Sequence, residues 1–133
     1  MYENVISRYL AMMNTLLNGP RHRFSEAPAN VPKEQGVYVI YDEKEKTAIY
    51  AGRTKNLRRR LLGDHKRGNI RGSQFRRALR QNPKLDSESQ ITRYIMENCG
   101  FQFMVIKKFE EMVRLEHFTA AVLAPLLNTR LKR

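Results

Sequence analysis

Two short runs of β-branched and aromatic residues, separated by a polar segment, place the strongest constraint on this fold. They occupy positions 36–41 and 48–53, and charged residues dominate positions 42–47 between them. Such runs are typical of strands, and a short polar link between two of them is typical of a β-hairpin. The second run reaches Gly52 and leads straight into an arginine-rich segment. We therefore predict a hairpin that carries Tyr38 and Tyr50 toward the start of a basic helix.

The length and charge of the chain narrow its class. A chain of 133 residues is long enough to bury a core as one domain, so we expect a single domain over 1–133. The net charge of +12 favours a polyanionic partner, because such a surface attracts phosphates and releases their counterions. Cys99 is the only cysteine, and no signal-peptide pattern or membrane-length apolar run is present. We expect a cytoplasmic protein with no membrane association.

Periodicity divides the chain into three parts. Apolar residues recur every three or four positions up to a stop at Asn18-Gly19-Pro20, which predicts an N-terminal helix over 1–18. Positions 19–35 read as an extended connector, although Phe24 and Val31 suit packing under the sheet. Within 36–128, a dense apolar run at 101–106 predicts a third strand, and a final helix is expected over 109–124.

The segment after the hairpin carries charge of almost one sign. Thr54 is expected to cap a first helix that Gly63 frays or ends, and Ser73 to cap a second helix with Arg76 and Arg77 outward. Asp64 is the single acid between positions 53 and 80. The basic residues there are Arg53, Lys55, Arg58, Arg59, Arg60, Lys66, Arg67, Arg71, Arg76, Arg77 and Arg80. A solvated face normally mixes signs, so this asymmetry favours nucleic-acid binding.

Glu116 lies at the border of the apolar stripe of the final helix. It follows Met112 by four residues and precedes Leu123 by seven. A carboxylate in that position needs a partner, because burying an unpaired charge is costly. It either pairs with an arginine of the basic segment or holds a divalent cation such as Mg²⁺, which commonly uses one or two carboxylates, waters and substrate phosphate.

Three further residues have both a structural and a chemical interpretation. Tyr38 and Tyr50 sit on adjacent strands, but the register that would bring them to one face is open. Half-buried strand tyrosines commonly serve packing, and a phenol needs help from an arginine or a metal-bound water to act as a base. Asn128, just after the final helix, is by default a cap or turn residue.

With these residues laid out, the chain resembles the GIY-YIG nuclease superfamily. The two half-motifs are Gly36-Val37-Tyr38 and Tyr50-Ala51-Gly52, and the run 56–61 is similar to the family's helix bearing the catalytic arginine, here Arg60. Leu115-Glu116, followed by Pro125 and Asn128, is similar to the family's metal-binding glutamate and closing Pro-x-x-Asn. The resemblance covers about 31–128, and the order and spacing of its parts carry its specificity.

The resemblance implies an α+β fold: a small three-stranded antiparallel sheet flanked by helices, here with an extra N-terminal helix. It also implies a metal-dependent endonuclease that hydrolyses DNA phosphodiester bonds. Glu116 would hold one Mg²⁺ or Mn²⁺ ion, and Arg60 would stabilise the charge of the transition state. Tyr38 or Tyr50 would orient or deprotonate the attacking water.

The same resemblance, together with the basic segment, implies a substrate-binding set. Arg53 stands where the excision-repair branch carries a lysine, Asn128 would fix the geometry of the site, and Gly52 would let the backbone turn closely. The expected substrate-binding residues are Gly52, Arg53, Lys55, Arg59, Arg76, Arg77 and Asn128.

Two positions depart from the family pattern. Ala51 replaces the usual isoleucine or valine, which removes packing volume. Many members carry a histidine or tyrosine four residues after the catalytic arginine, whereas here that position is Asp64 and the histidine is His65. Residues five apart are not neighbours on an α-helix, so His65 is expected to serve the site only if Gly63 breaks the helix and re-aims it.

The sequence leaves one rival function and the means of targeting open. The rival is a non-catalytic module that binds DNA or RNA through the same basic surface, whereas the one-signed basic segment disfavours a pure interaction protein. Family members usually borrow specificity from an added DNA-binding domain, for which this chain has no room. Targeting is therefore expected from the chain's own basic helices, a homodimer or a protein partner.

Overall fold

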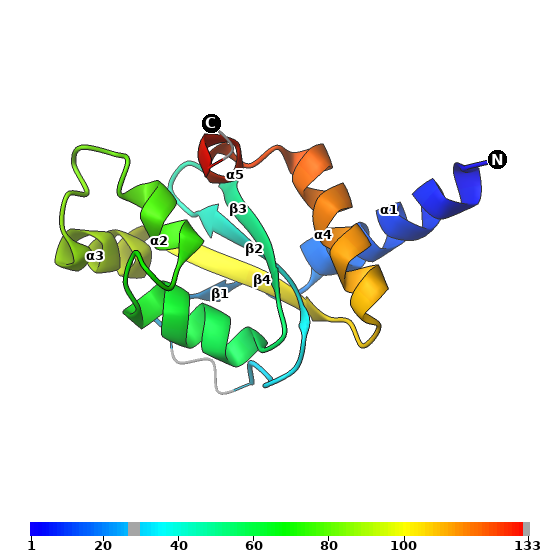
Figure 1. Ribbon diagram of the computed structural model, residues 1–133, viewed down its shortest axis with the longest axis horizontal. Helices are drawn as coiled ribbons and strands as arrows, with labels where there is room; N and C mark the ends of the chain where they lie inside the picture. The colour runs from blue at the N-terminus through cyan, green and yellow to red at the C-terminus, as the bar shows by residue number, and fades with distance from the viewer. Residues whose placement is uncertain (27–29, 132–133) are drawn as a thin grey trace.

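The computed structural model describes residues 1–26 and 30–131, so residues 27–29 of the expected connector lie outside the described residues. The helices are α1 (Glu3–Asn18), α2 (Gln74–Leu79), α3 (Glu88–Asn98), α4 (Phe109–Leu123) and α5 (Leu126–Leu131), with a π-helical segment η1 (Arg59–His65). The strands are β1 (His22–Arg23), β2 (Gly36–Asp42), β3 (Thr47–Thr54) and β4 (Cys99–Val105). Figure 1 shows the sheet between α1 and α4 at one side and α2 and α3 at the other.

The sheet is antiparallel, and its strand order is β1-β4-β2-β3 among the described residues. The three predicted strands are confirmed as β2, β3 and β4. The predicted count of three is wrong by one, because His22 and Arg23 in the connector pair with Phe101 and Gly100 of β4. Strand β2 lies in the middle and is buried along its whole length, as expected for a strand covered on both faces.

Alternate residues of β2 divide the core into two layers. Tyr38 and Ile40 face a layer formed with η1, α2 and α3, whereas Val37 and Val39 face a layer formed with α1 and α4. This is the period-two pattern of a strand with both faces covered. Phe24 and Val31 are fully buried in the first layer, as the sequence suggested. Strand β3 is an edge strand, and both α4 and α5 contact it.

Helix α1 is confirmed, but only part of its apolar stripe packs. Tyr9, Met13 and Leu16 are buried against the second layer. The N-terminal half projects from the body (Figure 1), and its exposed apolar side chains are Tyr2, Val5, Ile6 and Leu10. The helix is anchored at its C-terminal end, where Gln102 donates from Nε2 to the carbonyls of Leu17 and Gly19. Those carbonyls have no partner within the helix itself.

The C-terminal region contains one more helix than predicted. Helix α4 ends as expected near Pro125, and its cap residue Ala124 is left-handed, with φ of 44°. The chain then turns into α5, so α4 is not the final helix. Helix α5 contacts β3 and α2, which places Asn128 beside the edge strand. None of the helices among the described residues has the length and apolar character needed to span a bilayer.

Candidate active site

Tyr38 and Tyr50 lie on one face of the sheet. The register pairs Tyr38 with Gly52 and Ile40 with Tyr50, so the two tyrosines are diagonal neighbours. Residues two apart on a strand share a face, and diagonal side chains on adjacent strands are within reach of each other. Their ring centroids are 6.3 Å apart. The register that the sequence left open therefore brings both phenols to the same site.

Position 52 must be glycine because the Tyr38 phenol packs against it, and not because the backbone turns there. It lies within β3, opposite Tyr38, so the expectation that it lets the backbone turn is wrong. A Cβ at this position would lie 2.5 Å from the Tyr38 hydroxyl oxygen and 2.6 Å from Cζ. Any side chain there would push the phenol away. The absence of a side chain at Gly52 thus allows the Tyr38 hydroxyl to lie directly over the edge strand.

The basic helix continues through Gly63, contrary to the prediction that it ends there. It runs helically from position 57 to 67, and η1 (Arg59–His65) forms its middle. A π-helix bonds residues five apart instead of four. This changes which side chains share a face, so His65 joins the site without a break in the helix. Its Nε2 atom is 2.7 Å from the Tyr38 hydroxyl oxygen.

His65 is fully buried among aromatic rings. Tyr50 and Phe75 meet its ring edge-on, at centroid distances of 5.9 Å and 5.4 Å. Burial, and to a smaller extent the nearby cations Arg60 and Arg76, lower the pKa of His65 to about 3. The imidazole is therefore neutral near pH 7. It acts as a neutral hydrogen-bonding group toward Tyr38.

Both phenols resist ionisation. Burial raises the pKa of Tyr38 well above its usual value, and Tyr50 adds to the rise while Arg60 opposes it. Burial likewise raises the pKa of Tyr50 to about 12, again opposed by Arg60. Glu116 raises the pKa of both tyrosines, so its carboxylate and the Arg60 guanidinium both act on this pair. A phenol here can serve as a base near neutral pH only with added positive charge.

Arg60 and Glu116 belong to helices of the two different core layers, and both act on the tyrosines through their charge. Arg60 comes from η1, with Nε 3.4 Å from Oδ2 of Asp64. Glu116 comes from α4, and its Oε1 accepts a hydrogen bond from Nη1 of Arg53 at 2.6 Å. The pairing of Glu116 with an arginine, one of the two interpretations left open by the sequence, is thus present. Asp64 lies outside the Tyr38–His65 contact and pairs with Arg60 instead.

Asn128 fixes the edge strand at the site. Its Oδ1 accepts from the backbone N–H of Ala51 at 2.8 Å, and its Nδ2 donates to the Ala51 carbonyl at 2.9 Å. An edge strand has unpaired backbone groups, and this pair of bonds satisfies two of them. Ala51 lies between Tyr50 and Gly52. Asn128 is therefore neither the cap nor the turn residue of the default interpretation.

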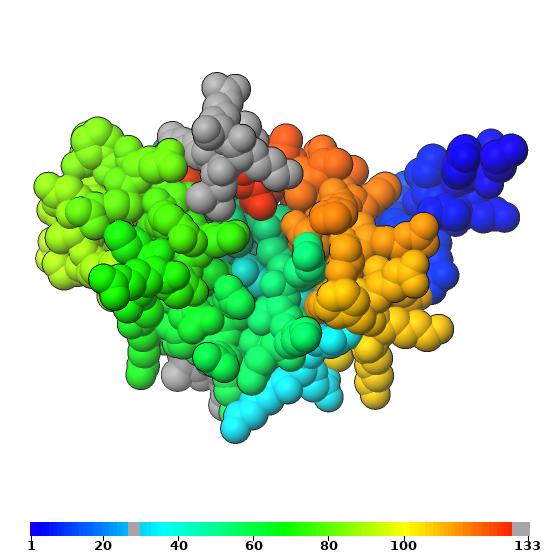
Figure 2. All heavy atoms as spheres, in the orientation of Figure 1, coloured from blue at the N-terminus to red at the C-terminus, as the bar shows by residue number. Residues whose placement is uncertain are grey.

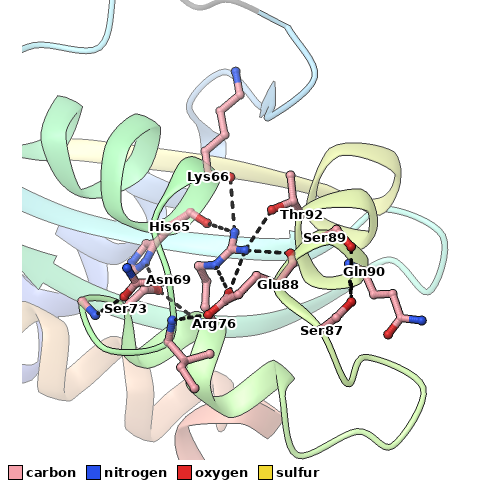
Figure 3. Close-up of polar contacts among 12 residues, drawn as sticks. His65, Lys66, Asn69, Ser73, Arg76, Ser87, Glu88, Ser89, Gln90 and Thr92 are labelled. Carbon is pink, nitrogen blue, oxygen red and sulfur yellow. Dashed lines mark hydrogen bonds and ion pairs between the residues drawn. The ribbon is translucent and has the colours of Figure 1, made fainter.

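The basic residues expected to bind the substrate divide into exposed and buried members. Lys55, Arg59 and Arg77 are exposed. Arg76, which was expected to point outward, is fully buried, so that expectation is wrong. Its Nη1 donates to the carbonyls of His65 and Lys66 at 3.1 and 3.3 Å (Figure 3). Those carbonyls lie near the end of the basic helix, where backbone acceptors lack partners.

Other bonds hold Arg76 from the side of α3. Its Nη2 donates to Oε1 of Glu88 at 3.1 Å, to the Glu88 carbonyl at 3.0 Å and to the Thr92 hydroxyl at 2.8 Å. Buried guanidinium groups need this many partners to offset their lost hydration. Arg76 thus ties the end of the basic helix to α3 and cannot bind a substrate from the surface.

The sequence missed a second role of Ser73. It begins α2 as predicted, accepting from the backbone N–H of Arg76 at 3.0 Å. Its Oγ is also 2.7 Å from Nδ1 of His65, on the opposite side of the ring from Tyr38. A cap serine carries no sequence signal for such a contact. Gln74 is a similar case, since its Oε1 accepts from the Tyr50 hydroxyl at 3.4 Å.

The surface is hollowed where these groups meet. In Figure 2 the hollow lies between the green atoms of the basic helices and the orange atoms of α4, with teal atoms of β3 on its floor. Among the described residues, no three His, Cys, Asp or Glu side chains gather as a cage for a metal ion. Among the described residues, the carboxylates that act on Tyr38 are Asp64 and Glu116, each paired with an arginine, and Glu116 is the oxygen donor that the resemblance singles out. Such a donor suits Mg²⁺, which completes its shell with water and phosphate.

Three comparisons relate the chain to known proteins. Residues 34–116 match the model of the GIY-YIG catalytic domain family. A search of the curated proteins gives no match. Among solved structures, the chain is similar to the GIY-YIG N-terminal endonuclease domain of UvrC from Thermotoga maritima bound to magnesium, with 23% identity and a TM-score of 0.44. That alignment covers 74% of this chain and 86% of the UvrC chain.

A point mutant of the same UvrC domain, bound to the catalytic divalent cation, gives 23% identity and a TM-score of 0.43, with the same coverage of 74% and 86%. Likenesses at this distance add nothing to the family match. The family model itself spans well over half of the chain and includes both tyrosines, Arg60, His65 and Glu116. The chain therefore belongs to the GIY-YIG family of endonuclease catalytic domains.

Proposed function

We propose that this endonuclease hydrolyses DNA phosphodiester bonds with one divalent ion, Mg²⁺ or Mn²⁺, held by Glu116. The observation that carries the proposal is the convergence at the edge strand. Tyr38, Tyr50 and His65 meet on one face of the sheet, and Arg60 and Glu116 act electrostatically on the same two phenols. A site of this kind combines positive charge with oxygen groups that can orient water, as phosphodiester hydrolysis requires.

The ion pair between Arg53 and Glu116 affects how the divalent ion would bind to Glu116. Arg53 binds one oxygen of Glu116, Oε1, and its positive charge opposes a cation at that carboxylate, whereas a phosphate in the site would offer the guanidinium a new partner. When bound, the ion would polarise the scissile phosphate and add positive charge beside it. We therefore infer that DNA and the ion enter together, with Arg53 moving from Glu116 to phosphate.

Each remaining group has a role that fits its surroundings. Arg60, half-exposed at the hollow, would stabilise the charge that develops on the phosphate. Tyr38 or Tyr50 would orient or deprotonate the attacking water, with added positive charge favouring the ionised phenol. His65 would hold Tyr38 in position through its 2.7 Å hydrogen bond.

Substrate binding is proposed for the exposed members of the predicted set. Arg53, Lys55, Arg59 and Arg77 would contact backbone phosphates, while Gly52 and Asn128 shape the edge strand beneath them. Arg76 is left out because it is buried. We further propose that 1–133 is a single intracellular nuclease domain with a core over 36–128. Its own basic helices, a homodimer or a protein partner would supply targeting.

The test compares cleavage by the wild type and Glu116→Gln. Supercoiled, branched and single-stranded DNA are incubated with each protein in Mg²⁺ or in EDTA, and RNA is included as a fourth substrate. We expect cleavage by the wild type only with metal, and a loss of roughly 100-fold or more in Glu116→Gln. Glu110→Gln is the control, since Glu110 is an exposed carboxylate on the same helix. It should cleave like the wild type.

The alternative is a non-catalytic module that binds nucleic acid through the same surface. The Arg53–Glu116 ion pair is the observation that favours it, because it occupies the carboxylate proposed for the metal. Tight binding without cleavage of any substrate would support this alternative. Cleavage that Glu116→Gln leaves unchanged would refute the proposed site.

A further inference from the structure

Ser73 lies behind His65, away from the hollow, and is fully buried. Its Oγ has two hydrogen-bond partners in the described part of the chain, the backbone N–H of Arg76 and Nδ1 of His65. An amide N–H can only donate, so Oγ accepts from Arg76. The hydroxyl hydrogen of Ser73 remains to be placed. Its position decides which nitrogen of the neutral His65 ring carries the proton.

The hydrogen bonds among Ser73, His65 and Tyr38 form a chain that can run in two directions. If Tyr38 donates to Nε2, then Nδ1–H donates to Ser73, and the Ser73 hydroxyl hydrogen is left without an acceptor. If Ser73 donates to Nδ1, then Nε2–H donates to Tyr38, and the leftover hydrogen is that of the Tyr38 hydroxyl. A buried donor without a partner is costly, so the leftover hydrogen belongs where an acceptor can arrive.

The Ser73 end and the Tyr38 end of this series of hydrogen bonds differ in whether an acceptor is available. Behind Ser73 stands the Arg76 amide, which is itself a donor. The Tyr38 hydroxyl lies over Gly52, at the edge strand where Arg60 and Glu116 act on it. Tyr38 is only 2% exposed, so the acceptor would be a water or phosphate oxygen that binds beside Gly52, where no side chain covers the hydroxyl. We propose that Ser73 is a positioning residue that donates to Nδ1 of His65 and thereby fixes the tautomer whose Nε2–H donates to Tyr38.

Arg76 makes this arrangement rigid, as Figure 3 shows. Its side chain holds the His65 carbonyl, and its backbone N–H holds the Ser73 hydroxyl. The edge-on rings of Tyr50 and Phe75 leave the imidazole little freedom to flip. Since burial keeps the pKa of His65 at about 3, the ring stays neutral and has a single N–H to assign near pH 7.

The consequence for cleavage rests on the proposed function. A donor at Nε2 stabilises negative charge on the Tyr38 oxygen and turns the phenol hydrogen toward the incoming substrate. Once the phenol has passed its hydrogen to a water or phosphate oxygen in the hollow, the Nε2–H of His65 stabilises the phenolate, and the phenolate can take a proton from the attacking water. In the opposite tautomer His65 would accept from Tyr38 and leave the phenol hydrogen unavailable to the substrate.

The tautomer is measured directly by NMR on the intact protein labelled with ¹⁵N-histidine. The imidazole ¹⁵N shifts and their couplings to ring hydrogens distinguish Nε2–H from Nδ1–H. We expect the Nε2–H form of His65 in the wild type, and in Ser73→Gly a weaker preference for it, seen as imidazole ¹⁵N shifts that move toward the average of the two forms. Glycine removes the hydroxyl yet remains an acceptable N-cap. The Nδ1–H form in the wild type would overturn the proposal.

Cleavage kinetics test the consequence. Ser73→Gly should lower kcat roughly tenfold or more, as loss of one orienting hydrogen bond predicts, with KM within about twofold. Ser73→Thr, which keeps the hydroxyl, should restore most of the rate. Ser87→Gly is the matched control, because Ser87 caps α3 in the same way without contacting His65.

Unchanged kcat in Ser73→Gly, or no rescue by Ser73→Thr, would contradict the positioning role. If even the wild type cleaves no substrate, the proposed function fails. The ¹⁵N measurement still decides the tautomer in that case, because it needs no activity.

Discussion

At the scale of single residues, His65 makes folding depend on pH. Its pKa is about 3 when folded and near 6.5 when exposed, so protons favour the unfolded chain. The stabilisation is fully present above pH 6.5 and is lost as pH falls toward 3. Between pH 7.5 and 5 this should cost the wild type about 2 kcal/mol of unfolding free energy. Urea denaturation across that range measures it.

His65→Gln is the comparison for that measurement. Glutamine keeps hydrogen-bonding groups but does not titrate. The variant should therefore lack the loss of about 2 kcal/mol that His65 causes between pH 7.5 and 5. All other titrating groups are shared with the wild type. If the unfolding free energy changed with pH equally in the two proteins, His65 would have the same pKa folded and unfolded, which would contradict its burial.

Arg76 and Arg77 are adjacent, have the same chemistry and should differ sharply in their effect on stability. Arg76→Met leaves the carbonyls of His65 and Lys66 without a donor and Glu88 without its pair, which should cost about 3 kcal/mol. Arg77→Met alters an exposed side chain and should change stability by less than about 0.5 kcal/mol. Denaturant unfolding of the two variants gives both values. Equal losses would contradict the role of Arg76.

The buried state of Arg76 was beyond sequence reasoning for a physical reason. The stripe Phe75, Ala78 and Leu79 correctly predicts the inner face of α2. Arg76 lies at the border of that stripe, and what draws it inward is the set of unpaired carbonyls at the end of a different helix. A sequence pattern shows which face of one helix is apolar. It does not show that the backbone carbonyls of another helix will lie beside Arg76 in the folded protein.

At the scale of elements, the π-helical segment explains the unusual spacing of Arg60 and His65. The predicted break at Gly63 followed from the low helix propensity of glycine, but i to i+5 bonding accommodates the extra residue within a continuous helix. The three long strands were predictable because dense β-branched and aromatic runs mark them. Strand β1 and helix α5 are too short to leave a reliable period.

Deletion of Gly63 tests this explanation. Removing one residue should convert the segment to an ordinary α-helix and place the histidine four positions after Arg60, which is the family's usual spacing. We expect a folded protein with cleavage within about tenfold of the wild type. Deleting Arg93 from the α-helical α3 is the control, because it would rotate Ile95 out of the core by about 100°. Circular dichroism and thermal melts measure the folding of both variants.

If deleting Gly63 unfolds the protein as thoroughly as deleting Arg93, then the π-helical segment η1 does not arise from one extra residue within an α-helix. A folded deletion variant whose histidine no longer contacts Tyr38 would likewise contradict this account of the spacing.

At the scale of the whole molecule, the site depends on contacts between distant parts of the chain. Tyr38 and Tyr50 come from the hairpin, Arg60 from the basic helix and Glu116 from α4 on the opposite side of the sheet. Spacing alone left the role of Glu116 open between an arginine pair and a metal ligand. Resemblance to the family, and not periodicity, linked it to the tyrosines. The strand register brings the two tyrosines to one face, and the charges of Arg60 and Glu116 act on both phenols.

In the proposed site, Arg60 and Glu116 act on the same phosphate. A double-mutant cycle tests it most directly, using single-turnover cleavage of supercoiled DNA by the wild type, Arg60→Ala, Glu116→Gln and the double variant. Each single change should lower the rate by roughly 100-fold or more, and the double variant should lose far less than the product of the two. A double loss equal to that product, or a single variant that cleaves like the wild type, would contradict a shared site.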